Sequence, residues 1–99
     1  IIIGNNYNES CNRGFTSLIK YNFNLYNYTL AENNPYPGGY ITRSLGSHKN
    51  GINVIQIEIN RSLYMDERSL IKNISNMNLL SKNLYLIIQN ILKDIIKFN

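Results

Sequence analysis

Apolar and polar positions in the first quarter of the chain predict a strand followed by a helix. Residues 1–4 are three isoleucines and a glycine, an uninterrupted apolar run typical of a strand buried on both faces of a sheet. The polar segment 5–12 favours a loop. Apolar residues then recur at helical spacing: Phe15, Leu18, Ile19 and Phe23. We therefore expect an amphipathic helix over residues 13–24 that packs on the sheet, as in a βα unit.

The middle of the chain predicts two strands around a shaped loop. Residues 26–31 are aromatic and β-branched, which favours a short strand. Residues 33–39 hold two prolines and two glycines, which restrict the backbone and let a ligand or another chain approach closely. Residues 51–59 give the clearest strand pattern, with Gln56 and Glu58 on one face at its carboxyl end. Ligands of open α/β sheets bind beyond the carboxyl ends of strands, so this pair is a candidate site.

The last third of the chain predicts helices. Residues 63–74 favour a short helix after Asp66 and Glu67 that turns three aliphatic side chains inward, Leu70, Ile71 and Ile74. Ser81 is typical of an N-cap. A helical apolar stripe follows it up to about Lys97, formed by Leu84, Ile87, Ile88, Ile91, Leu92, Ile95 and Ile96. The pattern as a whole predicts an α/β fold over residues 1–99, with helices packed on a mostly parallel sheet.

Composition sets limits on size and partners. The 99 residues suffice for one domain with a modest core and a folded surface of roughly 5,800 Å². Asparagine fills 18 positions, a bias attributed to an adenine- and thymine-rich genome and given no functional meaning. The net charge of +4 comes from scattered Lys and Arg residues without a run that would follow a phosphate backbone, so no nucleic acid is expected.

Cysteine use and apolar run length indicate the compartment. Cys11 is the only cysteine, so no internal disulfide can form, and a reducing, cytoplasmic environment is expected. No stretch approaches the ~18 consecutive apolar residues of a membrane span, so no membrane contact is expected. The chain begins with Ile1, inside what resembles a buried strand, and we expect it to be part of a longer protein.

A long ordered motif carries a family resemblance. It runs from Pro35 through Gly38-Gly39 to Ile41-Thr42-Arg43, and after Gly46 it continues as Gln56-Ile57-Glu58-Ile59-Asn60-Arg61-Ser62-Leu63-Tyr64-Met65-Asp66-Glu67. This motif resembles the carboxyl-terminal part of the N-formylglutamate amidohydrolase family, and Ile2-Ile3-Gly4 and Ser10-Cys11 are similar to an early strand and Ser-Cys turn of that family. The resemblance covers essentially the whole chain and is strongest from Pro35 to Glu67.

The resemblance implies a zinc-dependent hydrolase of N-formylglutamate or a related N-acyl amino acid. The implied fold is a partial three-layer domain similar to zinc carboxypeptidases (phosphorylase/hydrolase-like). Glu58 matches the family's strand glutamate and is implied to be the base that takes a proton from the attacking water. Arg43 matches the family's Ile-Thr-Arg and is implied to pair with a substrate carboxylate or the developing oxyanion. Gln56, beside Glu58, is the second candidate for substrate binding.

The family's metal ligands have no counterpart in this sequence. They resemble a His and an acidic residue in an early His-Ser-Gly-type segment plus a later His, all upstream of the matched part. We therefore assign no metal ligand here and expect this chain alone to bind no zinc. Family members also often have His where this chain has Ser44 and Asn53, which indicates a change of substrate or activity.

Each candidate side chain also has an explanation without chemistry. These are a solvated strand-end carboxylate for Glu58, a surface arginine for Arg43, an exposed loop residue for His48, a small packing residue for Cys11, and half-buried packing groups for Tyr36, Tyr40 and Tyr64.

Two functions remain open. In the first, the chain is part of an amidohydrolase that is active only when an amino-terminal part, in the same or a separate polypeptide, supplies zinc ligands. In the second, it is a truncated, non-enzymatic remnant that self-associates or binds a partner through a bare sheet edge, with Ile1 to Ile3 as the exposed apolar strand. An upstream His-Ser-Gly segment in the adjacent coding sequence would favour the first.

Overall fold

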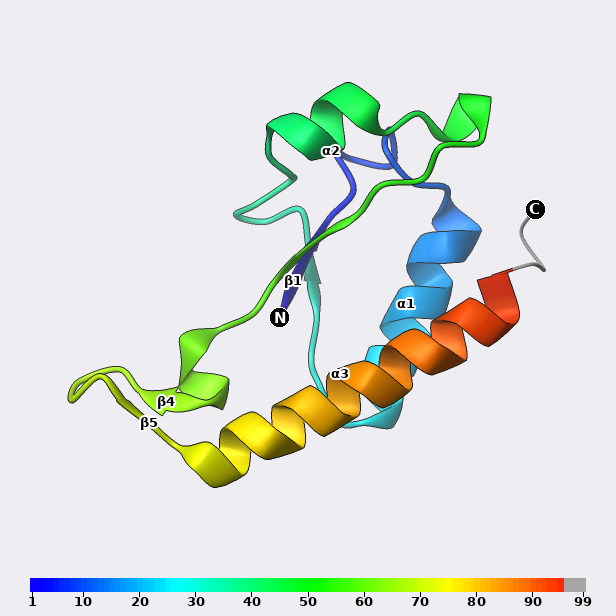
Figure 1. Cartoon of the computed structure of the whole chain (residues 1–99). Helices are drawn as coiled ribbons and strands as arrows, with labels where there is room; N and C mark the ends of the chain where they lie inside the picture. The colour runs from blue at the N-terminus through cyan, green and yellow to red at the C-terminus, as the bar shows by residue number, and fades with distance from the viewer. Residues whose placement is uncertain (96–99) are drawn as a thin grey trace.

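Strand β1 (Ile2–Gly4) is the central strand of a three-stranded sheet in the computed structural model, which describes residues 1–95 (Figure 1). It pairs in parallel with β2 (Ala31–Glu32) and antiparallel with β3 (Gln56–Glu58). The apolar run at the start of the chain suits this place, because Ile3 is fully buried between the two neighbours. The fold is α/β as predicted, but the sheet is mixed, so the expectation of a mostly parallel sheet is wrong.

The central place of β1 also corrects the predicted bare edge. Ile1 and Ile2 are half-buried and β1 is paired on both sides, so the free edges of the sheet belong to β2 and β3. Both edge strands are shorter than predicted. Residues 26–30 run into β2 without pairing. Residues 51–55 approach β3 with only an isolated bridge between Ser47 and Ile52.

Helices α1 (Arg13–Leu25) and α3 (Ile74–Asp94) pack against each other and against β1 (Figure 1). The Asn12 side chain accepts a hydrogen bond of 2.7 Å from the Phe15 N–H, so α1 begins where the sequence predicts. Four buried residues form the centre of the core: Ile3, Ile19, Phe23 and Ile87. The core therefore joins one strand to two helices that are distant in sequence.

Helix α3 begins well before its predicted N-cap. The Asn73 side chain accepts from the Asn76 N–H at 3.0 Å and caps the helix, so Ser81 lies inside it. Of the predicted stripe, Leu84, Ile87 and Ile91 pack on the core, whereas Ile88 and Leu92 are 54% and 60% exposed. The stripe is narrower than predicted because α1 covers only one side of α3. The last member of the stripe, Ile96, and the predicted helix end near Lys97 lie outside the described residues.

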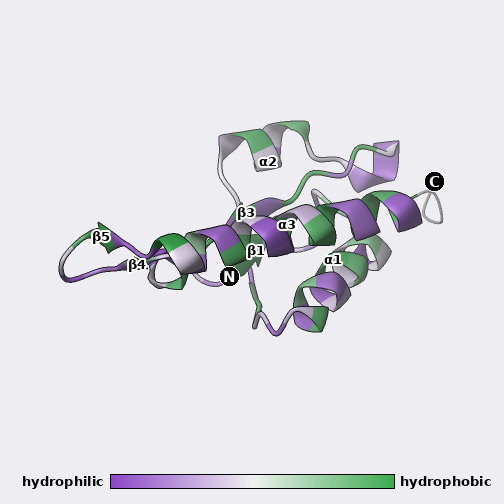
Figure 2. Cartoon of the chain, turned by 60° about the horizontal axis from the view of Figure 1, so that its bottom comes forward, coloured by the Kyte–Doolittle hydropathy of each residue, from purple (hydrophilic) through white to green (hydrophobic). Residues whose placement is uncertain are grey.

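A β-hairpin replaces the short helix predicted over residues 63–74. After a 3-10 helix (Arg61–Leu63), strands β4 (Met65–Asp66) and β5 (Ile71–Lys72) pair antiparallel. The Asp66 carboxylate accepts from the N–H groups of the next turn, which favours a turn over a helix. Leu70, Ile71 and Ile74, predicted to point inward, are 63%, 67% and 63% exposed. Figure 2 shows apolar residues on this hairpin and at the start of α3.

The remaining elements lie between α1 and the hairpin in sequence. Helix α2 (Tyr40–Leu45) is followed by a 3-10 helix (His48–Asn50), and Figure 2 shows α2 on the opposite side of the strands from α1. The radius of gyration is 14.4 Å, above the about 13 Å usual for this length. The accessible surface of 6812 Å² likewise exceeds the expected value of roughly 5,800 Å². The chain is thus more extended than a typical domain. No helix within residues 1–95 is long and apolar enough to cross a membrane.

Candidate functional site

The loop of residues 33–39 is held against the end of β1. A Cβ on Gly4 would lie 2.7 Å from the Pro37 carbonyl carbon and the Tyr36 carbonyl oxygen, so this approach requires glycine. The Asn6 N–H donates to the Pro37 carbonyl at 2.8 Å. The loop thus lies against the backbone of β1 at Gly4, and the predicted approach of a ligand or another chain to the loop stays a prediction.

A buried asparagine network holds the other end of the loop. The Asn5 N–H donates to Asn33 Oδ1 at 2.9 Å, Asn33 Nδ2 donates back to Asn5 Oδ1 at 2.9 Å, and Asn5 Nδ2 donates to Thr16 Oγ1 at 3.2 Å. Asn5 is only 1% exposed, so these bonds satisfy polar groups that would otherwise be costly to bury. Although the asparagine content of the chain as a whole is given no functional meaning, Asn5 and Asn33 have a structural role.

Gln56 and Glu58 lie together at the centre of the candidate site, on one face of β3 as predicted. Gln56 Nε2 donates to Glu58 Oε1 at 2.6 Å, and Gln56 Oε1 accepts from the Gly39 N–H at 2.7 Å. Both side chains are half-buried. A hydrogen bond to an ionised carboxylate is among the stronger ones in proteins, so the Glu58 side chain is held in a defined orientation.

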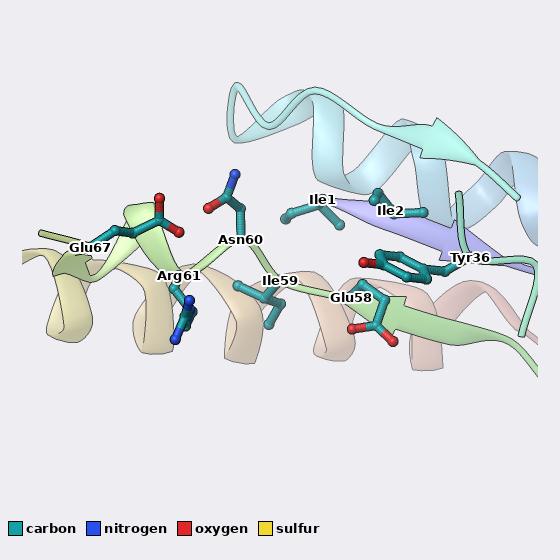
Figure 3. A pocket seen from close by; sticks show the side chains of 8 residues that line it. All are labelled: Ile1, Ile2, Tyr36, Glu58, Ile59, Asn60, Arg61 and Glu67. Carbon is teal, nitrogen blue, oxygen red and sulfur yellow. The ribbon is translucent and has the colours of Figure 1, made fainter. Parts of the chain in front are cut away.

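Glu58 also lines a pocket of about 350 Å³ beside the start of β1 (Figure 3). The pocket is formed by Ile1, Ile2, Tyr36, Glu67 and residues 58–61. Because β3 is antiparallel to β1, its carboxyl end lies next to the amino end of β1, with Glu58 opposite Ile2. Glu58 is the last residue of β3 and residues 59–61 follow it, so the pocket lies at the carboxyl end of its own strand, as predicted, although the neighbouring strand β1 runs the other way. The volume lies within the range of small-molecule sites.

Sequence reasoning assigned only Glu58 among the pocket residues to the site, and those that it missed include Tyr36, Arg61 and Glu67. All three belong to the motif that carries the family resemblance, which is the signal that would have found them. In Figure 3 the Arg61 guanidinium and the Glu58 carboxylate point to the same side of the strand, whereas Asn60 points to the other. The pocket thus combines one guanidinium with two carboxylates and can bind a charged, polar molecule.

Arg43 does not line this pocket. It is exposed on α2, whose N-cap is Gly39, the residue that donates to Gln56. The structure therefore connects Arg43 with Glu58 only through the backbone of α2 and the Gln56 amide. Tyr40 on the same helix is 77% exposed and Tyr36 52% exposed, so neither is the half-buried packing group that the sequence predicts. Tyr64 is half-buried, as predicted.

The burial and hydrogen bonds of Cys11, His48 and Asn53 indicate structural roles. Cys11 is fully buried, and this burial raises the pKa of its thiol, an effect that a hydrogen bond with Thr16 only partly opposes. A thiol in this state is a packing group, as predicted, rather than a nucleophile. His48 is half-buried in a 3-10 helix instead of exposed. Asn53 Oδ1 accepts from the Asn12 N–H at 2.8 Å. This hydrogen bond links the segment before β3 to Asn12, the N-cap of α1.

The described residues do not fit a catalytic zinc ion. Within residues 1–95, no three His, Cys, Asp or Glu side chains lie close enough together to hold a metal. The pocket itself brings together only two carboxylates, Glu58 and Glu67, which is fewer than the three protein ligands of a catalytic zinc site.

Comparison with known proteins confirms the resemblance. The model of the N-formylglutamate amidohydrolase family matches residues 1–65. A crystal structure of N-formylglutamate amidohydrolase from Ralstonia eutropha JMP134 superposes with a TM-score of 0.78 at 27% sequence identity. The match covers 93% of this chain and 33% of that one, so this chain spans about a third of the length of the protein that it resembles. No curated protein matches the sequence.

Proposed function

Because this chain belongs to the N-formylglutamate amidohydrolase family, we propose that it forms the Glu58-bearing part of an enzyme that cleaves the amide bond of N-formylglutamate or a related N-acyl amino acid. The observation that carries this proposal is the Glu58 carboxylate, which lies in the matched segment, is oriented by Gln56 and lines a pocket. The complete fold would be the three-layer domain of the zinc carboxypeptidases. The buried, unpaired Cys11 fits an enzyme of the cytoplasm.

Glu58 would act as a general base. Its carboxylate takes a proton from the water whose oxygen attacks the acyl carbon, and the same proton is then delivered to the departing amine nitrogen as the carbon–nitrogen bond breaks. Formate and glutamate would be the products from N-formylglutamate. A carboxylate whose position is set before the substrate arrives lowers the cost of organising this step.

The zinc ion that the resemblance implies would be held outside residues 1–95. We propose that its ligands come from a further part of the amidohydrolase, in the same chain or in a separate polypeptide, and that this chain alone is inactive. The structural match supports this division, because two-thirds of the Ralstonia protein has no counterpart in this chain.

Two arginines are candidates for binding the carboxylates of the substrate. Arg43 is the arginine that the family motif indicates, whereas Arg61 lies in the pocket with Glu58. A guanidinium pairs with a carboxylate through two parallel hydrogen bonds, so either residue has the required chemistry. The geometry favours Arg61 for a carboxylate bound next to Glu58 and leaves Arg43 for a more distant one.

Glu58→Gln tests the base. In the complete protein that contains this chain, we expect the variant to keep its fold and to lower turnover of N-formylglutamate at least ~100-fold, because an amide cannot accept the water's proton. Circular dichroism and steady-state kinetics measure the two effects. Glu9→Gln is the matched control, since Glu9 is exposed and does not line the pocket. Near-native turnover in Glu58→Gln would remove Glu58 from the mechanism.

Arg43→Ala and Arg61→Ala separate the two candidate clamps. The arginine that binds the substrate carboxylate should raise the Michaelis constant by at least ~10-fold on removal, because a charged hydrogen-bonded pair is worth roughly 1.5–3 kcal/mol. The other variant should change it little. If turnover falls while the Michaelis constant stays constant, the arginine in question stabilises the oxyanion instead.

A non-enzymatic role in partner binding is the second candidate function. It is favoured by the apolar side chains exposed on the hairpin and α3, which include Ile71, Ile74 and Ile88. A second copy of the chain or the remainder of the amidohydrolase are the proposed partners. Failure of the complete, zinc-loaded protein to hydrolyse any N-acyl amino acid would favour this role over catalysis.

A further inference from the structure

We propose that Gln56 is a positioning residue, which orients the Glu58 carboxylate and couples it to the start of α2, instead of a ligand of the substrate. The inference deepens the proposed function and rests on the role given there to Glu58. The motif alone makes Gln56 a candidate for substrate binding. Its hydrogen bonds point elsewhere, because each end of its amide already makes a short hydrogen bond within the protein.

The two hydrogen bonds of Gln56 permit only one orientation of its amide. The Gly39 N–H at 2.7 Å is a donor, so it requires the amide oxygen of Gln56. The amide nitrogen then faces Glu58 Oε1 at 2.6 Å, where an ionised carboxylate can only accept. Rotation of the amide by half a turn would oppose two acceptors at one end and two donors at the other. The hydrogen bond from the Gly39 N–H thus turns the amide nitrogen of Gln56, and not its oxygen, toward the Glu58 carboxylate.

The Gly39 N–H is itself held in place. Gly38 has φ +128°, a conformation that favours glycine, and a Cβ there would lie 2.7 Å from Thr42 Cγ2. Thr42 is 3% exposed and belongs to the first turn of α2, where the Gly39 carbonyl accepts from the Arg43 N–H at 3.1 Å. Gln56 therefore connects the Glu58 carboxylate to the backbone at the N-cap of α2, an element different from the strand that carries Glu58.

Nuclear magnetic resonance on the 99-residue chain tests the coupling without any hydrolysis. The Gln56 side-chain amide signals should move as Glu58 is protonated at acidic pH, and Glu58→Gln should abolish this movement. Gln56→Met, which keeps the length but neither hydrogen bond, should shift the Gly39 amide signal. Gln89→Met is the matched control, because Gln89 makes a similar hydrogen bond on exposed α3, to the Tyr85 hydroxyl at 2.8 Å. The proposal would be overturned if the Gln56 side-chain amide signals did not move when Glu58 is protonated.

Kinetics of the complete protein separate positioning from substrate binding. For Gln56→Met we expect a turnover number about 10- to 100-fold lower, with a Michaelis constant within about twofold of the native value. Gln56→Glu retains an acceptor for the Gly39 N–H but places a second carboxylate beside Glu58. Carboxylates that share a site titrate as a pair with one pKa raised, so the acid limb of the turnover profile should move to higher pH.

The outcomes distinguish this inference from the proposed function. A Michaelis constant that rises in Gln56→Met while turnover stays native would make Gln56 a substrate ligand and overturn the inference. Native turnover in Glu58→Gln would instead refute the catalytic base. In that case the resonance experiment still decides whether Gln56 orients Glu58.

Discussion

The part of the chain up to β3 and the part after it are held in their structures by different forces. In residues 1–58, buried polar side chains such as Asn5 and Thr16 are hydrogen-bonded to one another, and glycines allow the backbone segments to touch. In residues 59–95, the described part of the second region, only Leu80 and Ile87 are buried. This region consists of a hairpin and one long helix that packs along a single narrow stripe.

This difference explains where the candidate site lies. A catalytic group needs a position that is defined to a fraction of an ångström, and such precision requires support from hydrogen bonds and close packing. Glu58 has this support through Gln56 and Gly39. The second region contributes residues 59–61 and Glu67 to the pocket, whereas its hairpin and α3 expose apolar side chains, which suits an interface better than a site for chemistry.

The largest expected effect on stability comes from comparing a buried apolar residue of the first region with an exposed apolar residue of the second. Phe23→Ala removes a ring that is 1% exposed in the core and should lower the free energy of unfolding by about 3–5 kcal/mol. Leu79→Ala, on the part of α3 that is exposed, should change it by less than about 0.5 kcal/mol. Urea titration followed by circular dichroism measures both. A large loss in Leu79→Ala would show that this part of α3 is covered in solution, and the comparison between the regions would fail.

An intermediate effect is expected from close backbone contact in the first region. Gly4→Ala would place a Cβ 2.7 Å from the Pro37 backbone and should cost about 1–3 kcal/mol of stability. Gly39→Ala is the control, because its Cβ would lie at an ordinary 3.4 Å from Gln56 Oε1 and its φ of −86° suits any residue. Thermal unfolding of both variants tests the contact. Equal stabilities would mean that the loop does not lie against β1.

The smallest effect concerns the start of α3 in the second region. Asn73→Ala removes the observed N-cap and should cost about 1 kcal/mol. Ser81→Ala replaces a residue inside the helix by a better helix former and should be neutral or stabilising by a few tenths of a kcal/mol, at about the level of helix propensities. The opposite order of stabilities, measured by the same unfolding titration, would place the helix start at Ser81.

The sequence predicted the first region well and the second poorly. The apolar run of β1, the stripe of α1 and the polar pair on β3 all appear where their patterns indicate. The hairpin was missed because its strands have two residues each, too few for a period to show. The helix start was misplaced because Asn73 and Ser81 are both good caps, and local chemistry cannot choose between them.

The sequence by itself determined β1, α1, the polar pair on β3 and the family, since side-chain spacing and an ordered motif are properties of neighbouring residues. The tertiary structure decided the direction of β3, and with it the place of the pocket beside Ile1 and Ile2. Strand direction depends on the path of the chain between Gly4 and Gln56, and no local pattern records that path. Pocket residues such as Arg61 and Glu67 come together for the same reason, because packing joins positions that no sequence period relates.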